Sequence, residues 1–283
     1  MKVVIVTDAT RAFGIDMVSE LCREGYFVIA IARDAKESEF IKKTVTHRYD
    51  FAQIETFVGS YDSIRSLRQV VLNIRLLATE YKFNGIYAIL CNQERVYPEF
   101  KFNEDKIERT FMENYLTNIF LAESLLDFLQ NEKDSRVILP TLPQNQLVGI
   151  NMADIYRERA YDPQSAIRQC KFANAMMAGY INGVLNVGEK PVRAILYETR
   201  DVATDEELDE EKPQGKFARI FNKPTEFDVL MNTIIATVND KSRGGVCYKA
   251  SKPISAPAVC ANKDLCEKFW VLSEKISKLK YFD

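Results

Sequence analysis

The turn at residues 7–14 carries the clearest chemistry in this sequence of 283 residues. It joins a short apolar run at residues 2–7 to a helical pattern at residues 14–23, and Gly14 stands where that helix begins. Main-chain N–H groups in such a turn, together with the helix N-terminus, bind a pyrophosphate when glycine lets the backbone approach the anion. The turn therefore predicts a phosphate site of the dinucleotide-binding type.

The elements around this turn form a strand–turn–helix–strand unit. Residues 2–7 read KVVIVT, a β-branched run that is typical of a strand buried on both faces. Apolar residues recur at helical spacing through residues 14–23, and Gly25 is placed to end that helix. Residues 26–32 (YFVIAIA) predict a second buried strand. A unit of this kind is the first half of a dinucleotide-binding fold.

Strand and helix patterns alternate through the rest of the chain. They predict the α/β class, with residues 1–283 forming a single doubly wound Rossmann-type domain of about seven parallel strands covered by helices on both faces. Residues 34–50 are polar and predict a short helix and a loop. Further strands are expected at 54–58, 85–91, 137–139 and 192–197 and after the turn at 244–245, and further helices at 61–81, 104–129, 165–185 and 227–238 and after Asn262.

Composition and charge exclude several classes of protein. A net charge of -2 gives no reason to expect nucleic acid or an anionic membrane as a partner. The six cysteines have no paired metal spacing and His47 is the only histidine, so reduced buried thiols and no metal site are expected. No apolar run approaches the roughly 18 residues of a membrane span, and Asp8 interrupts the N-terminal run too early for a signal peptide. A cytoplasmic protein is expected.

Residues 200–225 differ from the rest in composition. They hold the acidic cluster 205–211 (DEELDEE), followed by Pro213 and Gly215. Such a stretch is most often a solvated insertion, and a lid-like loop or a docking surface is the functional alternative.

Several short motifs resemble one known family in their order and spacing. Residues 7–14 resemble the TGxxxGxG turn of the short-chain dehydrogenases/reductases, and the likeness is closest to their retinol dehydrogenase-like branch. The motifs that resemble that branch are residues 32–34 (ARD), 62–65 (DSIR), 103–121, 171–174 (KFAN) and the tail 244–279.

The resemblance implies a set of site residues. Lys171 matches the family's catalytic lysine, Asn114 its helix asparagine, and Thr141 lies one residue from the position of its serine. The positions implied for cofactor binding, if any binding is kept, are Thr7, Arg11, Gly14, Arg33 and Asn92. Arg11 and Arg33 match positions that favour the adenosine 2′-phosphate of NADP.

The sequence departs from the family pattern at positions that carry catalysis or cofactor binding. The family's general acid, a tyrosine four residues before the lysine, is replaced by Ile167, which cannot transfer a proton. Asp8 and Ala12 replace two glycines of the phosphate turn, and Glu94 replaces the glycine of the turn after the fourth strand. Phe57 stands where the family has an aspartate that contacts the adenine, and residues 198–199 (ET) stand where it has a proline–glycine turn after the sixth strand. Tyr156 and Tyr161 are the alternative proton donors, whereas the YxxxK of residues 248–252 lies in the predicted tail strand.

Three functions stay open at this point. The first is a degenerate family member without redox turnover, which binds NADP(H) weakly or not at all and acts as a binding or scaffold protein for an unidentified protein partner. The second is an NADP-dependent oxidoreductase of a carbonyl or alcohol substrate, and the third is a non-catalytic NADP(H) sensor. The family's pairing of the helices that match 104–129 and 165–185 also implies a homodimer.

Overall fold

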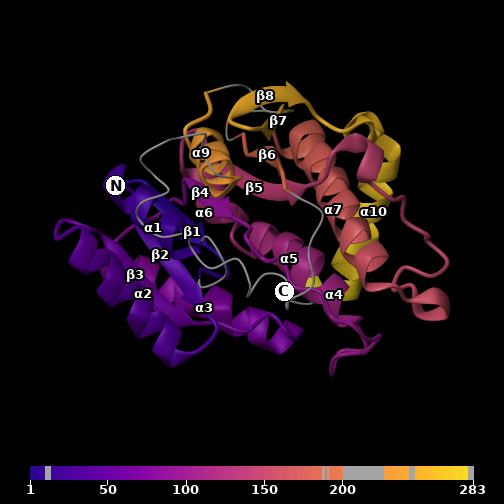
Figure 1. Cartoon of the computed structure of the whole chain (residues 1–283), viewed down its shortest axis with the longest axis horizontal. Coiled ribbons are helices and arrows are strands. Elements are labelled where there is room, and N and C mark those ends of the chain that lie inside the picture. Colours follow the sequence, from indigo (N-terminus) through magenta and orange to yellow (C-terminus); the bar gives the residue numbers. More distant parts are fainter. Residues whose placement is uncertain (10–13, 187–188, 190, 200–225, 242–245, 280–283) are drawn as a thin grey trace.

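The fold is built on one eight-stranded sheet (Figure 1), seen in a computed structural model that describes residues 1–9, 14–186, 189, 191–199, 226–241 and 246–279. The strand order is β3-β2-β1-β4-β5-β6-β7-β8. The first seven strands of that order run parallel, and β8 pairs antiparallel with β7. The strands are β1 (Val3–Val6), β2 (Phe27–Ala32), β3 (Ile54–Val58), β4 (Ala88–Leu90), β5 (Arg136–Thr141), β6 (Arg193–Glu198), β7 (Val246–Lys249) and β8 (Lys252–Ser255). The predicted α/β class with a Rossmann-type parallel sheet is confirmed.

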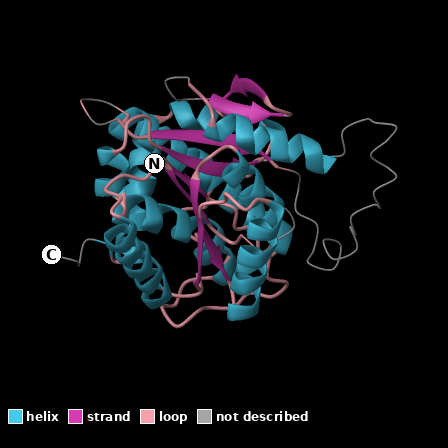
Figure 2. Cartoon of the chain, turned by 90° about the vertical axis from the view of Figure 1, so that its left-hand side faces the viewer, coloured by secondary structure: helices cyan, strands magenta, loops and turns pink. Residues whose placement is uncertain are grey.

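Helices cover both faces of the sheet, which lies between them in Figure 2. Alternate residues of β1 show why: Val3 and Ile5 join the core under one helix layer, and Val4 and Val6 join the core under the other. One layer holds α1 (Gly14–Arg23), α2 (Ala35–Arg48) and α9 (Glu226–Val238). The other layer holds α3 (Ile64–Tyr81), α4 (Arg109–Phe111), α5 (Thr117–Ser124), α6 (Leu126–Asn131), α7 (Pro163–Tyr180) and α10 (Lys263–Ser277).

Two helix predictions were wrong in their bounds. The polar stretch after β2 forms the 14-residue helix α2, because Asp34 caps it by accepting from the Glu37 N–H and because Ile41 and Val45 are buried. The helix expected at 104–129 begins only at Arg109, since Lys106 adopts a positive φ of 60° and Glu108 caps α4. It is then interrupted by the π-helical turn η1 (Met112–Leu116) and breaks again at Leu125.

The hairpin β7–β8 adds a strand that the sequence did not predict. Residues 252–255 read KPIS, and a proline-containing run of four residues carries little strand signal. Ala250 and Ser251 both adopt positive φ and turn the chain back, which places β8 at the sheet edge. The YxxxK of residues 248–252 therefore lies in this hairpin.

The C-terminal segment packs on α7, as Figure 1 shows for α7 and α10. A Cβ added to Gly179 of α7 would lie 2.8 Å from the Cys260 carbonyl oxygen and 2.8 Å from the Cys266 sulfur. Tyr180 stacks on Trp270 of α10, with ring centroids 4.3 Å apart. Part of α7, which belongs to one of the two segments implied for dimerisation, thus packs against the chain's own tail. Among the described residues, each helix is too short or too polar to cross a bilayer.

Candidate functional site

The candidate site lies where the strand order reverses, between the carboxyl ends of β1 and β4. Hydrogen bonds join these two strand ends. The Asn92 N–H donates to the Thr7 hydroxyl at 2.9 Å, and the Asn92 side-chain amide donates to the Asp8 carbonyl at 3.0 Å. The Thr7 hydroxyl in turn donates to Oε1 of Gln93 at 2.8 Å. Thr7 and Asn92, both predicted as cofactor residues, are therefore brought together by the fold.

Asp8 is held at the end of β1 with a positive φ of 48° and no exposed surface. Its carboxylate accepts two hydrogen bonds from Arg33 at the end of β2, with Nε–Oδ1 at 2.9 Å and Nη2–Oδ2 at 2.5 Å. The Asp8 N–H donates to the Tyr61 hydroxyl at 3.0 Å. The carboxylate that the sequence places in the phosphate turn is thus engaged by Arg33.

Gly14, the first residue of α1, lies very close to the backbone of Ala9, which follows β1. A Cβ at this position would lie 1.9 Å from the Ala9 carbonyl oxygen, so only glycine fits. Arg11, implied for cofactor binding, and Ala12, which replaces a glycine of the phosphate turn, lie outside the described residues.

Lys171 lies on α7 with only 1% of its side chain exposed. Its ammonium group forms an ion pair with Glu94, whose side chain is 29% exposed and which follows β4. This partner was missed by sequence reasoning, because the two residues are 77 positions apart. The only signal was that an acidic residue stands where the family has glycine.

Ile167, one turn before Lys171, is fully buried in the apolar core between α7 and the sheet. Thr141 is also fully buried, and its hydroxyl lies 3.5 Å from the Lys171 carbonyl oxygen. The hydroxyl offered as a substitute for the family's serine thus bonds to the α7 backbone. Neither residue brings a proton donor to the Lys171 ammonium group.

Asn114 lies in the π-helical turn and holds the backbone of Arg95. Its Oδ1 accepts from the Arg95 N–H at 2.8 Å, and its Nδ2 donates to the Arg95 carbonyl at 2.6 Å. Its own carbonyl accepts from the Asn118 amide at 3.0 Å. The residue therefore fixes the loop that follows β4.

A buried tyrosine–glutamate pair, absent from the predicted site, lies beside this loop. The Tyr97 hydroxyl donates to Oε1 of Glu113, and burial raises the pKa of both groups. The charges of Arg33 and Arg95 lower the Glu113 pKa in part. A lone acidic residue on a predicted helix gives no sequence signal for such a pair.

Comparisons with known proteins fit this architecture, although no family model matches the chain. The chain is 24% identical over 209 residues to mouse polyprenol dehydrogenase, which covers 72% of this chain and 61% of that protein. It is 29% identical over 181 residues to the short-chain dehydrogenase TIC 32 B of Brassica napus, covering 61% and 55% respectively. It is 27% identical over 175 residues to mouse retinol dehydrogenase 13, covering 61% and 50%. The chain spans less than two thirds of the length of each.

Solved structures agree over more of the chain. An uncharacterized protein of Mycobacterium paratuberculosis superposes with a TM-score of 0.69 at 20% identity, covering 98% of this chain and 94% of that one. A metagenomic short-chain oxidoreductase in complex with NADP gives a TM-score of 0.58 at 13% identity, covering 90% and 94%. The chain thus resembles short-chain dehydrogenases/reductases in sequence and shares the fold of short-chain oxidoreductases.

The described residues do not fit the NADP(H) of this family at the phosphate turn. Asp8 presents a buried carboxylate there, and Arg33, the expected ligand of the 2′-phosphate, already binds that carboxylate. Like charges in a partly dry site repel by several kcal/mol if unscreened. Lys171, the family's ribose ligand, is likewise paired with Glu94.

The two tyrosines that were considered as replacements are committed to structural contacts. The Tyr161 hydroxyl donates to the Tyr97 carbonyl at 2.8 Å and lies 2.9 Å from the Thr110 hydroxyl. The Tyr156 ring packs edge-on against Phe111, and burial raises its pKa to about 12. The Tyr161 hydroxyl is thus engaged by two neighbours, and the Tyr156 ring is engaged in packing.

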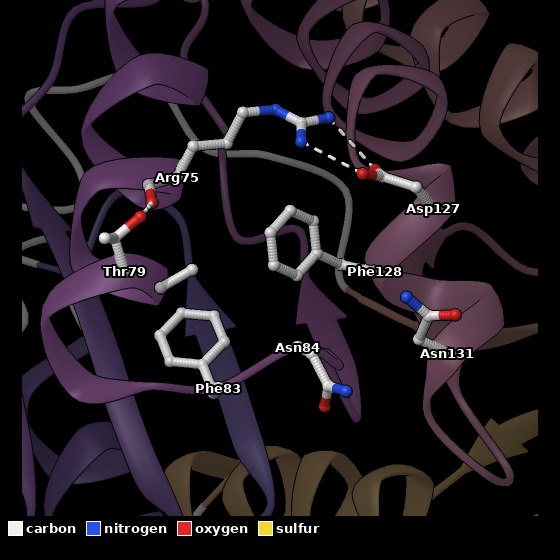
Figure 3. Close-up of a pocket in the computed structure, with 8 residues that line it drawn as sticks. Arg75, Thr79, Phe83, Asn84, Asp127, Phe128 and Asn131 are labelled. Carbon is white, nitrogen blue, oxygen red and sulfur yellow. Dashed lines mark hydrogen bonds and ion pairs between the residues drawn. The ribbon is translucent and has the colours of Figure 1, made fainter.

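A surface hollow lies between α3 and α6 (Figure 3). Its volume is about 380 Å³, and Phe83 and Phe128 form its apolar wall. Arg75 forms an ion pair with Asp127 across it, with Nη1–Oδ2 at 2.9 Å. Because these charges are already paired, the hollow contributes no chemistry to the site. The described residues also contain no cluster of three metal-ligating side chains.

Proposed function

We propose that this short-chain dehydrogenase/reductase member has lost redox turnover and acts as a binding or scaffold protein. The observation that carries the proposal is the Lys171–Glu94 ion pair beside the buried Ile167. The lysine that would tune a catalytic tyrosine is held by a carboxylate, and the tyrosine itself is absent. Loss of a general acid commonly lowers a rate about 10²- to 10⁴-fold.

The Asp8–Arg33 ion pair supports weak or absent NADP(H) binding in the same protein. Both groups would have to separate before the 2′-phosphate could reach Arg33, and the freed Asp8 would then repel the pyrophosphate. Five of the six cysteines are buried, which suits reduced thiols in the cytoplasm, the compartment we propose. We keep the homodimer as a secondary proposal.

The alternative function is an NADP-dependent oxidoreductase of a carbonyl or alcohol substrate. It is favoured by the retention of Lys171, Asn114 and Arg33 at the family's positions and by the NADP complex of one structural relative. A non-catalytic NADP(H) sensor would keep the same residues without turnover.

The experiment is a fluorescence titration of the purified protein with NADPH, followed by assays of NADPH oxidation with a panel of aldehydes and ketones. The double variant Asp8→Gly with Ala12→Gly is titrated in parallel. We expect negligible binding by the native protein and a gain of binding without turnover in the variant. Tight native binding without turnover would identify a sensor, and turnover would establish the oxidoreductase; either result would overturn the proposal.

A further inference from the structure

Two arginines lie against the ring of one tyrosine beside the candidate site. The Arg109 guanidinium carbon is 3.8 Å from the centroid of the Tyr97 ring, and that of Arg95 is 5.2 Å from it. Both side chains are half-buried. Among the residues that the structure describes, neither guanidinium has a carboxylate or other hydrogen-bond acceptor as a partner.

The lack of a direct ion pair or side-chain hydrogen bond among the described residues sets the two arginines apart from their neighbours. Arg33 pairs with Asp8, and the exposed Arg48 pairs with Asp16 at 2.7 Å. A charge that is withdrawn from water without a partner is unfavourable, and stacking on an aromatic ring offsets only part of that cost. Two such charges on one ring also repel each other. An anion bound by both guanidinium groups would relieve both effects.

Tyr97, whose ring both arginines contact, is held in place by burial and by hydrogen bonds. Only 8% of Tyr97 is exposed, its hydroxyl donates to Glu113, and its carbonyl accepts from Tyr161. Asn114 holds both backbone groups of Arg95, as described above. Arg109 is the first residue of α4, whose N-terminus is capped by Glu108. The site is therefore built before a ligand arrives, which lowers the entropy lost on binding.

We propose that Arg95 and Arg109, held on the ring of Tyr97, bind a small oxyanion: the phosphate or carboxylate group of a ligand that docks beside the candidate site. The planar guanidinium fork matches both groups and binds them with two parallel hydrogen bonds. The Glu113 carboxylate accepts from the Tyr97 hydroxyl and forms no ion pair with either arginine among the described residues. This site does not depend on NADP(H) binding or on turnover.

Calorimetric titration of the full chain tests the proposal, with inorganic phosphate and succinate as separate probes. The variants are Arg95→Gln, Arg109→Gln and the double variant, and Arg48→Gln is the control because it removes an equal charge from a distant surface. We expect saturable binding by the native protein and the control. Binding should weaken at least tenfold in each single variant and be undetectable in the double variant. Circular dichroism establishes that each variant is folded.

The two probes distinguish the sources of the oxyanion. A preference for phosphate assigns a phosphorylated ligand, and a preference for succinate assigns a carboxylic acid; either supports the site. Arg95→Lys with Arg109→Lys keeps the charge but loses the fork, and we expect intermediate affinity. Absence of saturable binding to both probes, or binding unchanged in the folded double variant, overturns the proposal. Neither result bears on the loss of redox turnover, which is measured with NADPH.

Discussion

The Asp8 carboxylate and the Arg33 guanidinium form a two-pronged ion pair across the ends of β1 and β2. From the family resemblance alone, Asp8 is a departure from the phosphate turn and Arg33 is a separate residue expected to bind NADP. In the structure they are one feature, because each neutralises the other. The chain's own carboxylate thus supplies the negative charge that Arg33 binds.

Breaking this pair from one side should destabilise the fold. Arg33→Gln leaves the fully buried Asp8 carboxylate without its cation, and we expect a loss of about 2–4 kcal/mol in the free energy of unfolding, since Arg33 is 23% exposed and partly screened. Asp8→Asn should also destabilise, because it leaves Arg33 without an anion. Urea unfolding at neutral pH measures both.

The double variant Asp8→Asn with Arg33→Gln gives the critical comparison. Because it removes both charges, it should lose less stability than the sum of the two single variants. Arg48→Gln, which breaks the exposed pair with Asp16, is the control and should cost no more than about 1 kcal/mol. Strict additivity in the cycle would mean that the two residues do not interact in solution.

Restoring the missing tyrosine alone should not restore chemistry. Ile167 is fully buried, so Ile167→Tyr overpacks the core and should cost about 1–3 kcal/mol. Lys171 remains bound to Glu94, and we therefore expect no NADPH oxidation from this variant. Ile167→Phe is the matched control, because it adds the ring without the hydroxyl. Measurable turnover by Ile167→Tyr but not by Ile167→Phe would contradict this account.

The sequence predicted the sheet well because buried parallel strands leave strong local signals. Residues 54–58 match β3 and residues 14–23 match α1, and Gly25 adopts the positive φ of 85° expected after a helix. Asn262 caps α10 by accepting from the Leu265 N–H at 3.1 Å, and α10 is the helix expected after Asn262. Local hydrophobic pattern and capping are sufficient for such elements.

The site was predicted less completely, because its partners are distant in the chain. Nothing local to Lys171 indicates Glu94, and nothing local to Asp8 indicates Arg33, 25 residues later. Asn114, in the π-helical turn, accepts from the Arg95 backbone N–H, a contact that no periodicity reports. Ion pairs and tertiary hydrogen bonds of this kind follow only once the strand order is known.

Arg136 should be among the most sensitive positions for stability. It is 1% exposed, and its guanidinium donates to the carbonyls of Val238 at 2.9 Å and Asp240 at 2.6 Å, at the end of α9. Arg136→Met would remove these buried charge-assisted hydrogen bonds and leave the two carbonyls only the longer ones from Tyr87 and Arg193, and we expect a loss of about 3 kcal/mol. Arg75→Met, which breaks an exposed pair, should cost about 1 kcal/mol or less. Similar losses for both variants in thermal unfolding would refute this ranking.

Glu113 should make stability depend on pH in the direction opposite to a surface carboxylate. Burial raises its pKa above the ordinary 4.5, so the folded state binds more protons than the unfolded state above that pH. The native protein therefore loses stability as the pH rises from about 4.5 through the raised pKa. Glu113→Gln keeps an oxygen that accepts from Tyr97 but cannot ionise, so its stability relative to the native protein should increase from about pH 4.5 to neutrality.

Urea unfolding across this range measures the difference, with Glu39→Gln as the control. Lys43 lowers the pKa of the exposed Glu39 carboxyl, so the native advantage at that site is present above pH 4.5 and fades as the pH falls. A Glu113→Gln difference that stays flat or declines with rising pH would show that the Glu113 carboxyl is not raised by burial.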